Sequence, residues 1–300
     1  MTFVSFAQNF EDVMLWRALG GVKAGFYIDA GAWSPDIDSV TRAFYERGWH
    51  GINVEPNPIW HRKLSEKRPR DINLLMALSD RIETLNFYVV GETGLSTTNV
   101  NYAREHESMG YPIQSISCPT TTMDIIWEEH VQKQEVHFMK VDVEGMEEAV
   151  VKGNDWKKHR PWLVLVESTY PNSKISAYQV WEPILLKADY HFAYADGLNR
   201  FYLASEHAEL SSAFAHPPNF LDDFKVAAQV EAEKEIANLK QKLNISEEDR
   251  EARLQIIRKQ EQQYTELHSK YTNALQLLAK IAQSRLYRWA RRIGRWDQVE

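Results

Sequence analysis

Two acidic motifs stand at the spacing of a nucleotide-binding βαβ unit. An apolar run that begins at Phe26 ends in Asp29-Ala-Gly31, and a second run, from Gly51, ends in Glu55. In such a unit the glycine turn lets the backbone approach a ligand, and the acid after the second strand accepts hydrogen bonds from a ribose. The spacing therefore predicts a nucleoside site, although Asp-x-Gly after a strand could also be an ordinary turn.

The sequence of the turn after Gly31 limits which nucleoside ligands could bind there. Trp33 and Pro35 stand where further glycines of a Gly-x-Gly-x-x-Gly motif would be, and no Gly-Lys-Ser/Thr follows. A dinucleotide or a triphosphate is therefore disfavoured. A nucleoside without a phosphate chain, such as S-adenosylmethionine (SAM), fits this turn better. We expect the indole of Trp33 to form a wall of the pocket.

A second group of charged residues follows a later apolar run. Lys140, Asp142 and Glu144 alternate along the chain, so in a strand their side chains would point to one side. Two carboxylates and an amine beside a cofactor could support acid–base chemistry. Asp142 is our first candidate for a general base, followed by Glu144 and by Glu167, which ends the next apolar run. The structural alternative is that Glu144 caps the next helix or pairs with Lys140.

A divalent metal is an alternative use of Asp142, Glu144 and Glu167, because carboxylate oxygens are good ligands for such ions. Their spacing does not establish a metal site. The ten histidines contain no His-x-His or His-x-x-x-His pair. We therefore assign no metal.

The elements that must position these residues alternate between apolar and amphipathic runs, as in α/β proteins. The expected strands lie at 25–30, 51–55, 72–77, 136–142 and 162–167, and the expected helices at 36–47, 57–67, 121–131, 146–152 and 176–188. Residues 190–204 resemble two strands joined by Asp-Gly-Leu-Asn, which is a hairpin signal. We predict a mostly parallel seven-stranded sheet that ends in an antiparallel hairpin, which is the layout of the Rossmann-like methyltransferases.

Residues 91–115 form the least regular stretch of this part, with Gly91, Gly94 and Gly110 among many polar residues. A loop of this length in a compact domain is usually functional or disordered. We favour an active-site lid over plain disorder.

The composition excludes several classes of protein. The net charge of −7 disfavours nucleic-acid binding, and the single cysteine, Cys118, excludes a disulfide framework and a cysteine metal cluster. The N-terminal residues show no signal-peptide pattern, and no apolar run is long enough to span a bilayer. We expect a cytoplasmic protein, with peripheral attachment to the inner face of the plasma membrane as a further expectation.

The composition changes near residue 222, so we divide the chain into residues 1–222, 223–283 and 284–300. The middle part is rich in Glu, Lys and Gln and predicts a long helix. A coiled-coil seam at 3–4 spacing is formed by Tyr264, Leu267, Tyr271, Ala274, Leu278 and Ile281, after an earlier register at Ile236, Leu239 and Leu243. Residues 244–253 interrupt it. We expect a homo-oligomer through this coil, and the alternative is a single solvated helix.

The last segment, 284–300, alternates five arginines with apolar residues. Helical spacing would place Leu286, Trp289, Ile293 and Trp296 on one face. A cationic face opposite tryptophans suits an anionic membrane surface. Contact with a partner protein is the alternative, and nucleic acid is disfavoured by the acidic remainder of the chain.

Taken together, the motifs resemble the FkbM-type SAM-dependent methyltransferases, from Ser5 to about Ala204. Six segments carry the resemblance in order: Ser5-Phe-Ala-Gln-Asn-Phe-Glu-Asp12, Ile28-Asp-Ala-Gly-Ala32, Gly51-Ile-Asn-Val-Glu-Pro-Asn-Pro58, Ala77-Leu-Ser-Asp80, Met139-Lys-Val-Asp-Val-Glu-Gly-Met-Glu147 and Leu165-Val-Glu167. The chain departs from the family at Trp33-Ser-Pro35, where many members carry Asn-x-Gly.

The resemblance implies a class I methyltransferase with SAM as methyl donor. It places the methionine portion of SAM at Asp29 and Gly31, and Glu55 would accept hydrogen bonds from both ribose hydroxyls, with Trp33 and Pro56 as further cofactor-binding residues. The adenine would lie between Leu78 and Ser79, and Gln8 and Asp12 would fold over the cofactor.

The function expected from the resemblance is O-methylation of a sugar hydroxyl in the biosynthesis of a cell-surface polysaccharide, such as O-antigen, or of a glycolipid. The acceptor would be a saccharide or glycolipid, and a glycosyltransferase is an expected partner. Two alternatives stay open: a non-catalytic coiled-coil scaffold with a ligand-binding domain, and a nucleotide-sugar enzyme with the same βαβ start.

Overall fold

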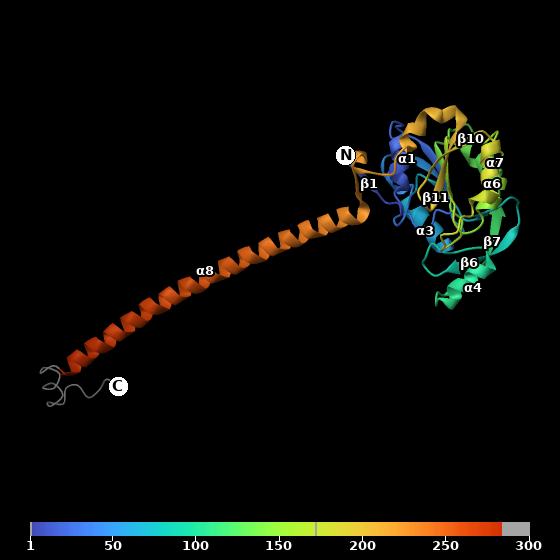
Figure 1. The fold of residues 1–300 in the computed structure, drawn as a ribbon. Helices are drawn as coiled ribbons and strands as arrows, with labels where there is room; N and C mark the ends of the chain where they lie inside the picture. Colours follow the sequence, from blue (N-terminus) through green and yellow to red (C-terminus); the bar gives the residue numbers. More distant parts are fainter. Residues whose placement is uncertain (1, 172, 284–300) are drawn as a thin grey trace. The chain divides into compact units, whose positions relative to one another are not determined.

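The computed structural model of the chain describes residues 2–171 and 173–283 (Figure 1). The chain divides into two units, Met1–Val230 and Glu231–Glu300, which are described separately. The predicted tail at 284–300 lies outside the described residues. Strand β12 (Phe224–Val226) pairs in parallel with β1 (Phe3–Ser5), so it belongs to the first unit although it follows residue 222.

The first unit is built on a seven-stranded mixed sheet. Its strand order is β10-β11-β9-β8-β2-β3-β4. The strands are β2 (Phe26–Ala30), β3 (His50–Val54), β4 (Ile72–Leu74), β8 (Phe138–Val141), β9 (Leu163–Glu167), β10 (Tyr190–Ala195) and β11 (Asn199–Ala204). Neighbours from β4 to β9 are parallel, and β11 is antiparallel to both β9 and β10. The predicted terminal hairpin is therefore confirmed in a mixed sheet.

Helices cover both faces of this sheet, which explains why its central strands are apolar throughout. One face packs against α1 (Glu11–Leu19) and α2 (Arg42–Glu46), through buried residues such as Leu15 and Phe44. The other face packs against α5 (Met123–Ile126) with the π-helical turn Trp127–Val131, α6 (Glu147–Lys152) and α7 (Glu182–Lys187). Figure 1 shows α1 on one side of the sheet and α6 and α7 on the other. Helix α3 (Pro58–Lys67) contacts β4.

The helix predicted at 36–47 is much shorter in the structure. The Ser34 hydroxyl accepts hydrogen bonds from the backbone N–H groups of Asp36 and Ile37, which forms a turn instead of a helix start. Asp38 then takes a left-handed backbone conformation with φ of 50°. Since this conformation does not propagate a right-handed helix, α2 begins only at Arg42.

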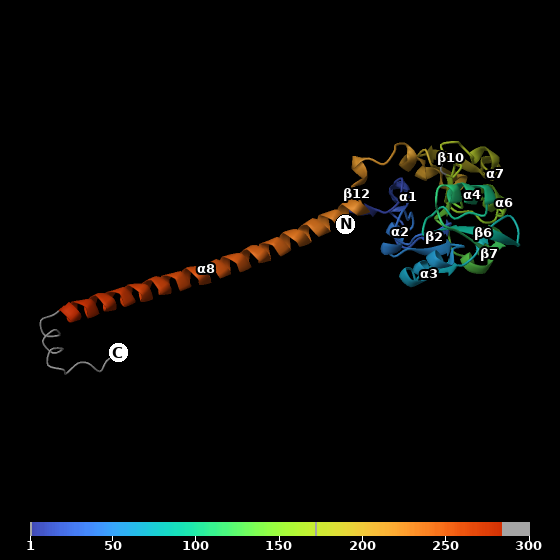
Figure 2. The same ribbon diagram turned by 90° about the horizontal axis from the view of Figure 1, so that it is seen from below.

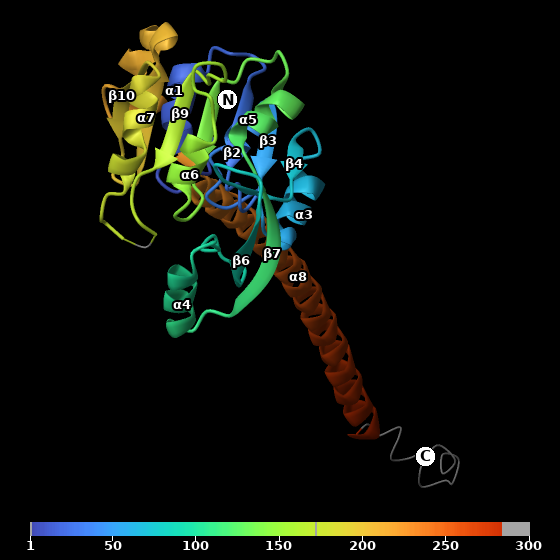
Figure 3. The ribbon, with the colours of Figure 1, turned by 90° about the vertical axis from the view of Figure 1, so that its right-hand side faces the viewer.

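Residues 77–121 contain a second sheet that the sequence reading missed. Strands β5 (Ala77–Leu78), β7 (Ile113–Thr121) and β6 (Thr84–Val90) lie side by side in that order, and Figure 3 shows β6 and β7 as a ribbon beside α4 (Val100–Ser108). The expectation of irregular structure throughout 91–115 was therefore wrong. The strand predicted at 72–77 was also wrong at its end, because β4 stops at Leu74 and Ala77 belongs to β5.

The described part of the second unit, 231–283, is helical throughout and belongs to helix α8 (Ala227–Gln283), which Figure 2 shows as one continuous helix. It is helical through 244–253, so the backbone shows no interruption there. At about 1.5 Å of rise per residue, its 57 residues extend over about 85 Å. Among residues 2–171 and 173–283, no helix combines the length and the apolarity that a membrane crossing requires.

Candidate active site

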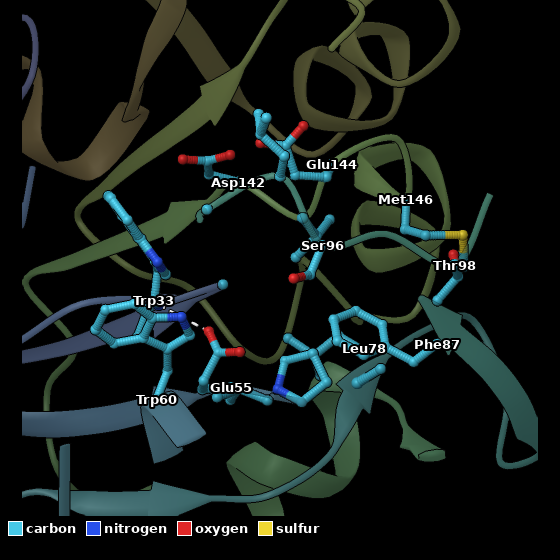
Figure 4. A pocket seen from close by; sticks show the side chains of 18 of the residues that line it. Trp33, Glu55, Trp60, Leu78, Phe87, Ser96, Thr98, Asp142, Glu144 and Met146 are labelled. Carbon is cyan, nitrogen blue, oxygen red and sulfur yellow. Dashed lines mark hydrogen bonds between the residues drawn. The ribbon is translucent and has the colours of Figure 1, made fainter. Parts of the chain in front are cut away.

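A cavity of about 250 Å³ lies at the carboxyl ends of β2, β3 and β8 (Figure 4). Crevices at this edge of an open α/β sheet are where ligands bind in such folds. The second sheet and the N-terminal turn close the cavity from other sides. It is lined by Gln8, Gly31, Ala32, Trp33, Asp38, Val54, Glu55, Pro56, Trp60, Met76, Ala77, Leu78, Phe87, Thr93, Gly94, Leu95, Ser96, Thr98, Lys140, Asp142, Val143, Glu144 and Met146.

The turn after β2 requires glycine at position 31. Gly31 has a φ of 80°, and a Cβ atom there would lie 1.8 Å from the carbonyl oxygen of Asp142. The N–H groups of Gly31 and Ala32 both donate to the carbonyl oxygen of Val54. The turn is thus held against the ends of both neighbouring strands, and its backbone borders the cavity.

Glu55 is a buried carboxylate that holds this turn in place. One of its oxygens accepts a hydrogen bond from Trp33 N–H at 2.8 Å, and the other accepts one from Asn57 N–H at 2.8 Å. Burial raises the pKa of Glu55 to about 7, although these two N–H donors partly oppose the shift. Figure 4 shows the carboxylate inside the cavity, where each oxygen keeps further capacity to accept a hydrogen bond from a ligand.

Aromatic rings line the cavity beside Glu55. The rings of Trp33 and Trp60 meet edge to face, with centroids 5.5 Å apart. A Cβ atom on Gly94 would come within 3.2 Å of the Trp33 indole, so this glycine lets the segment after β6 lie directly on the ring. The predicted position of Trp33 in the wall of the pocket agrees with the structure. Leu78 and Phe87 form another apolar part of the lining (Figure 4).

Lys140 connects the glycine turn with the carboxylates after β8. Its ammonium nitrogen lies 3.1 Å from the Gly31 carbonyl oxygen, 3.4 Å from Asp29 Oδ1 and 3.2 Å from Asp142 Oδ2. Burial would lower the pKa of Lys140, but Asp142 and Asp29 outweigh that effect and raise it well above its usual range. Lys140 therefore stays charged and orients Asp142 instead of acting as a base.

The three predicted catalytic carboxylates differ in their surroundings. Burial, together with Asp142 and Glu147, raises the pKa of Glu144 to about 8. Burial, then Asp142 and the other carboxylates, raises the pKa of Glu167 to about 11. Both therefore hold a proton at neutral pH and can donate hydrogen bonds. Asp142 faces the cavity with a side chain that is 36% exposed.

The segment 93–98 contributes five residues to the lining, which are Thr93, Gly94, Leu95, Ser96 and Thr98. It is anchored in the structure by Thr97, whose hydroxyl donates to the Glu144 carbonyl oxygen at 2.8 Å and whose backbone pairs with Tyr88. The predicted lid thus borders the cavity beside the carboxylates. Its opening and closing stay a prediction.

The family model for the methyltransferase FkbM domain matches residues 29–192, which is more than half of the 300-residue chain. The chain belongs to the FkbM methyltransferase family. The resemblance inferred from the sequence motifs is thereby confirmed.

Among solved structures, the chain matches a TehB-like SAM-dependent methyltransferase from Corynebacterium glutamicum ATCC 13032 Kitasato. The two chains share 7% sequence identity and superpose with a TM-score of 0.35, over 65% of this chain and 85% of that chain. No curated protein matches the sequence.

Four residues predicted from the FkbM motifs do not line this cavity, and these are Asp12, Asp29, Ser79 and Glu167; Ser79 instead borders a neighbouring hollow with Asp80 and Arg81. Asp12 is fully buried and accepts hydrogen bonds from the Ser5 hydroxyl and from the N–H groups of Phe6 and Ala7. It therefore holds the turn that carries Gln8, which does line the cavity. Asp29 accepts a hydrogen bond from Thr41 in addition to its ion pair with Lys140.

The FkbM cavity also contains residues that the sequence reading missed, chiefly Trp60, Phe87, Ser96 and Met146. A signal for Phe87 was present, because polar and apolar residues alternate along β6. Trp60 lies in the first turn of α3, directly after the Asn57 cap that Glu55 holds. Ser96 lies in the segment that we read only as a lid.

Proposed function

We propose that this FkbM-family protein is a SAM-dependent O-methyltransferase that acts on a sugar hydroxyl in a cell-surface polysaccharide or glycolipid. The observation that supports the proposal is one cavity with Glu55 on one side and Asp142 on the other, both beside the Gly31 turn (Figure 4). The strand order, with β11 antiparallel beside β9, is compatible with a class I methyltransferase sheet.

The residues present fit SAM. The Gly31 turn leaves no room for a side chain and exposes backbone to the ligand. Glu55 would accept the ribose hydroxyls, Leu78 and Phe87 would contact the adenine, and the turn at Gly31 and Trp33 would hold the methionine portion. The lining contains the acids Asp38, Glu55 and Asp142 against one lysine, Lys140, and this excess of acidic groups disfavours a phosphorylated ligand. When bound, SAM supplies an electrophilic methyl group on its sulfonium.

Residues of the chain would supply a general base and would fix the direction from which the acceptor hydroxyl attacks the methyl group. Asp142 would accept the proton of the attacking hydroxyl, while Lys140 orients its carboxylate through an ion pair at 3.2 Å. Glu144 and Glu167, which hold protons at neutral pH, would donate hydrogen bonds to neighbouring oxygens without competing for that proton. The rest of the catalysis would come from positioning the hydroxyl in line with the transferred methyl group.

The acceptor would approach from the side of the carboxylates. Tyr102 of α4 packs on the glycine after Glu144, because a Cβ atom on Gly145 would lie 3.0 Å from its ring. Tyr170 is 44% exposed, and burial, followed by the charge of Tyr170, raises the pKa of Tyr102. An aromatic surface beside carboxylates offers apolar contact and hydrogen bonds together, which suits a polyhydroxylated ring.

The direct test is methyl transfer from radiolabelled SAM to glycan fractions, followed by mass spectrometry of the surface glycan with and without this gene product. The proposal expects one methyl ether on a defined sugar, and its loss without the protein. A glycan that is identical in both cases, together with no transfer to any saccharide, would remove the sugar assignment. Specific binding of a nucleotide sugar, with no binding of SAM, would support a nucleotide-sugar enzyme instead.

A further inference from the structure

Helix α8 carries one uninterrupted heptad register on its surface. Counting Ile236 as position a, the a positions that follow are Leu243, Arg250, Ile257, Tyr264 and Tyr271, and the d positions are Leu239, Ser246, Arg253, Gln260, Leu267 and Ala274. The two apolar blocks before and after 244–253 are separated by a whole number of heptads. Since the helix is continuous there, both blocks lie on the same seam.

The seam is exposed along its length. Its large apolar residues are each between 49% and 71% exposed, and they are Ile236, Leu239, Leu243, Ile257, Tyr264, Leu267 and Tyr271. The other exposed apolar residues of α8 flank the seam at positions e or g, with the exception of Ile245, and they are Leu254, Ile256, Leu275 and Leu277. A long helix gains stability when such a stripe is buried against a partner.

The charges beside the seam are complementary to those of an identical helix. In a parallel pair, a g residue of one chain faces the e residue five positions later in the other. This rule brings Glu235 to Lys240 of the second copy and Lys242 to Glu247 of the second copy. By symmetry each contact occurs twice, so four oppositely charged pairs border the first block.

The polar centre of the seam also favours an in-register parallel pair. In that arrangement each apolar seam residue packs against the same residue of the second copy. An antiparallel pair would instead place Leu243 or Ile257 against polar residues such as Gln260 or Ser246. Arg250 at position a would lie beside Asp249 of the second copy, and Arg253 lies 3.8 Å from Asp249 within its own helix. Polar residues at seam positions reduce stability but specify register.

We propose that α8 is a dimerisation element that binds a second copy of this chain as a parallel, in-register coiled coil. The contact is formed by the seam from Ile236 to Tyr271 and by the charged pairs around Glu235 and Lys242. This inference does not depend on the proposed methyltransferase function, because it uses only the surface of α8.

The test is the mass of the full-length protein in solution, measured by sedimentation between 1 and 100 µM. The wild type should have twice the single-chain mass of 34.9 kDa. Leu267→Asp at a d position should weaken the dimer by at least about 100-fold, because a buried leucine contributes several kcal/mol in each chain. Gln262→Asp, at the outward f position, is the matched control and should leave the dimer intact. A wild type that stays monomeric at 100 µM, or a dimer that Leu267→Asp does not affect, would overturn the proposal.

Orientation is tested by disulfide formation in a Cys118→Ser background, since Cys118 is the only cysteine and is buried. Leu239→Cys should link two copies under oxidising conditions, and Gln241→Cys at an f position should not. An antiparallel pair would separate the two Leu239→Cys thiols and give no link, which would contradict the parallel arrangement.

Charge reversal at the pair of Glu235 and Lys240 is a third test of the dimer, and exchanging both charges should restore it. Glu235→Lys should raise the dissociation constant of the dimer about tenfold, because it sets two lysines against Lys240 residues. The double variant Glu235→Lys/Lys240→Glu should restore it by exchanging the charges. Equal weakening in the single and double variants would mean that these residues do not face each other.

Discussion

The two sides of the cavity hold their carboxylates in opposite ways. Glu55 is 5% exposed, and each of its oxygens accepts a backbone N–H from the turns that it braces. Asp142 is 36% exposed and has the buried ammonium group of Lys140 as its partner. A carboxylate fixed by backbone donors suits the recognition of a ligand, whereas an open carboxylate beside a cation suits the transfer of a proton. Under the proposed function, Glu55 therefore belongs to a binding side of the cavity and Asp142 to a reacting side.

The largest effect should come from the reacting side. Asp142→Asn keeps the shape of the side chain but removes the base, so turnover should fall by about 10²- to 10⁴-fold. The affinity for SAM should change by less than about twofold, because Asp142 lies away from Glu55 in the cavity. Steady-state kinetics combined with calorimetry measure both. Glu148→Gln on the exposed side of α6 is the control, and a turnover equal in both variants would remove Asp142 as the base.

Lys140 connects both sides, so its loss should affect stability as well as turnover. Lys140→Met leaves Asp29 buried without its cation, and breaking a buried ion pair costs about 3–5 kcal/mol of unfolding free energy. Urea denaturation measures this change. Lys63→Met, which removes an exposed ion pair with Glu92, should cost less than about 1 kcal/mol. Equal costs for the two substitutions would show that Lys140 does not hold the two sides together.

Glu144 should give the reacting side a pH dependence of stability. Its pKa is about 8 in the folded chain and near 4.5 in an unfolded chain, so the folded state binds the proton more tightly. Its contribution to stability is therefore complete below pH 4.5 and is lost as the pH rises through about 8. Glutamine in Glu144→Gln stays neutral at every pH. Between pH 5 and 9 the unfolding free energy of this variant should therefore fall by a few kcal/mol less than that of the wild type. Parallel pH curves of unfolding free energy for the two proteins would contradict the assignment.

The sequence predicted the central sheet well because its strands are buried on both faces and form compact apolar runs. It failed for β6 and β7, where only six of the sixteen residues are buried and the polar residues resemble a loop. The length of α2 was predicted wrongly for a related reason. The Ser34 turn and the left-handed conformation of Asp38 depend on local hydrogen bonds, which the periodicity of the sequence does not show.

For the site, spacing brought Gly31, Glu55, Asp142 and Glu144 to one cavity because all four follow parallel strands at the same sheet edge. It could not distinguish lining residues from supporting ones such as Asp12 and Asp29. That distinction depends on which way each side chain turns. It also could not rank the three carboxylates, because their protonation depends on burial and on each other.

The binding side carries the central claim, and calorimetric titration with SAM tests it most directly. Wild-type protein should bind SAM, and Glu55→Ala should lose at least about 30-fold in affinity, since hydrogen bonds to a charged group contribute about 1.5–3 kcal/mol each. Glu66→Ala on the exposed face of α3 should bind as the wild type does. Unaltered SAM affinity in Glu55→Ala, with the fold intact by circular dichroism, would contradict the account.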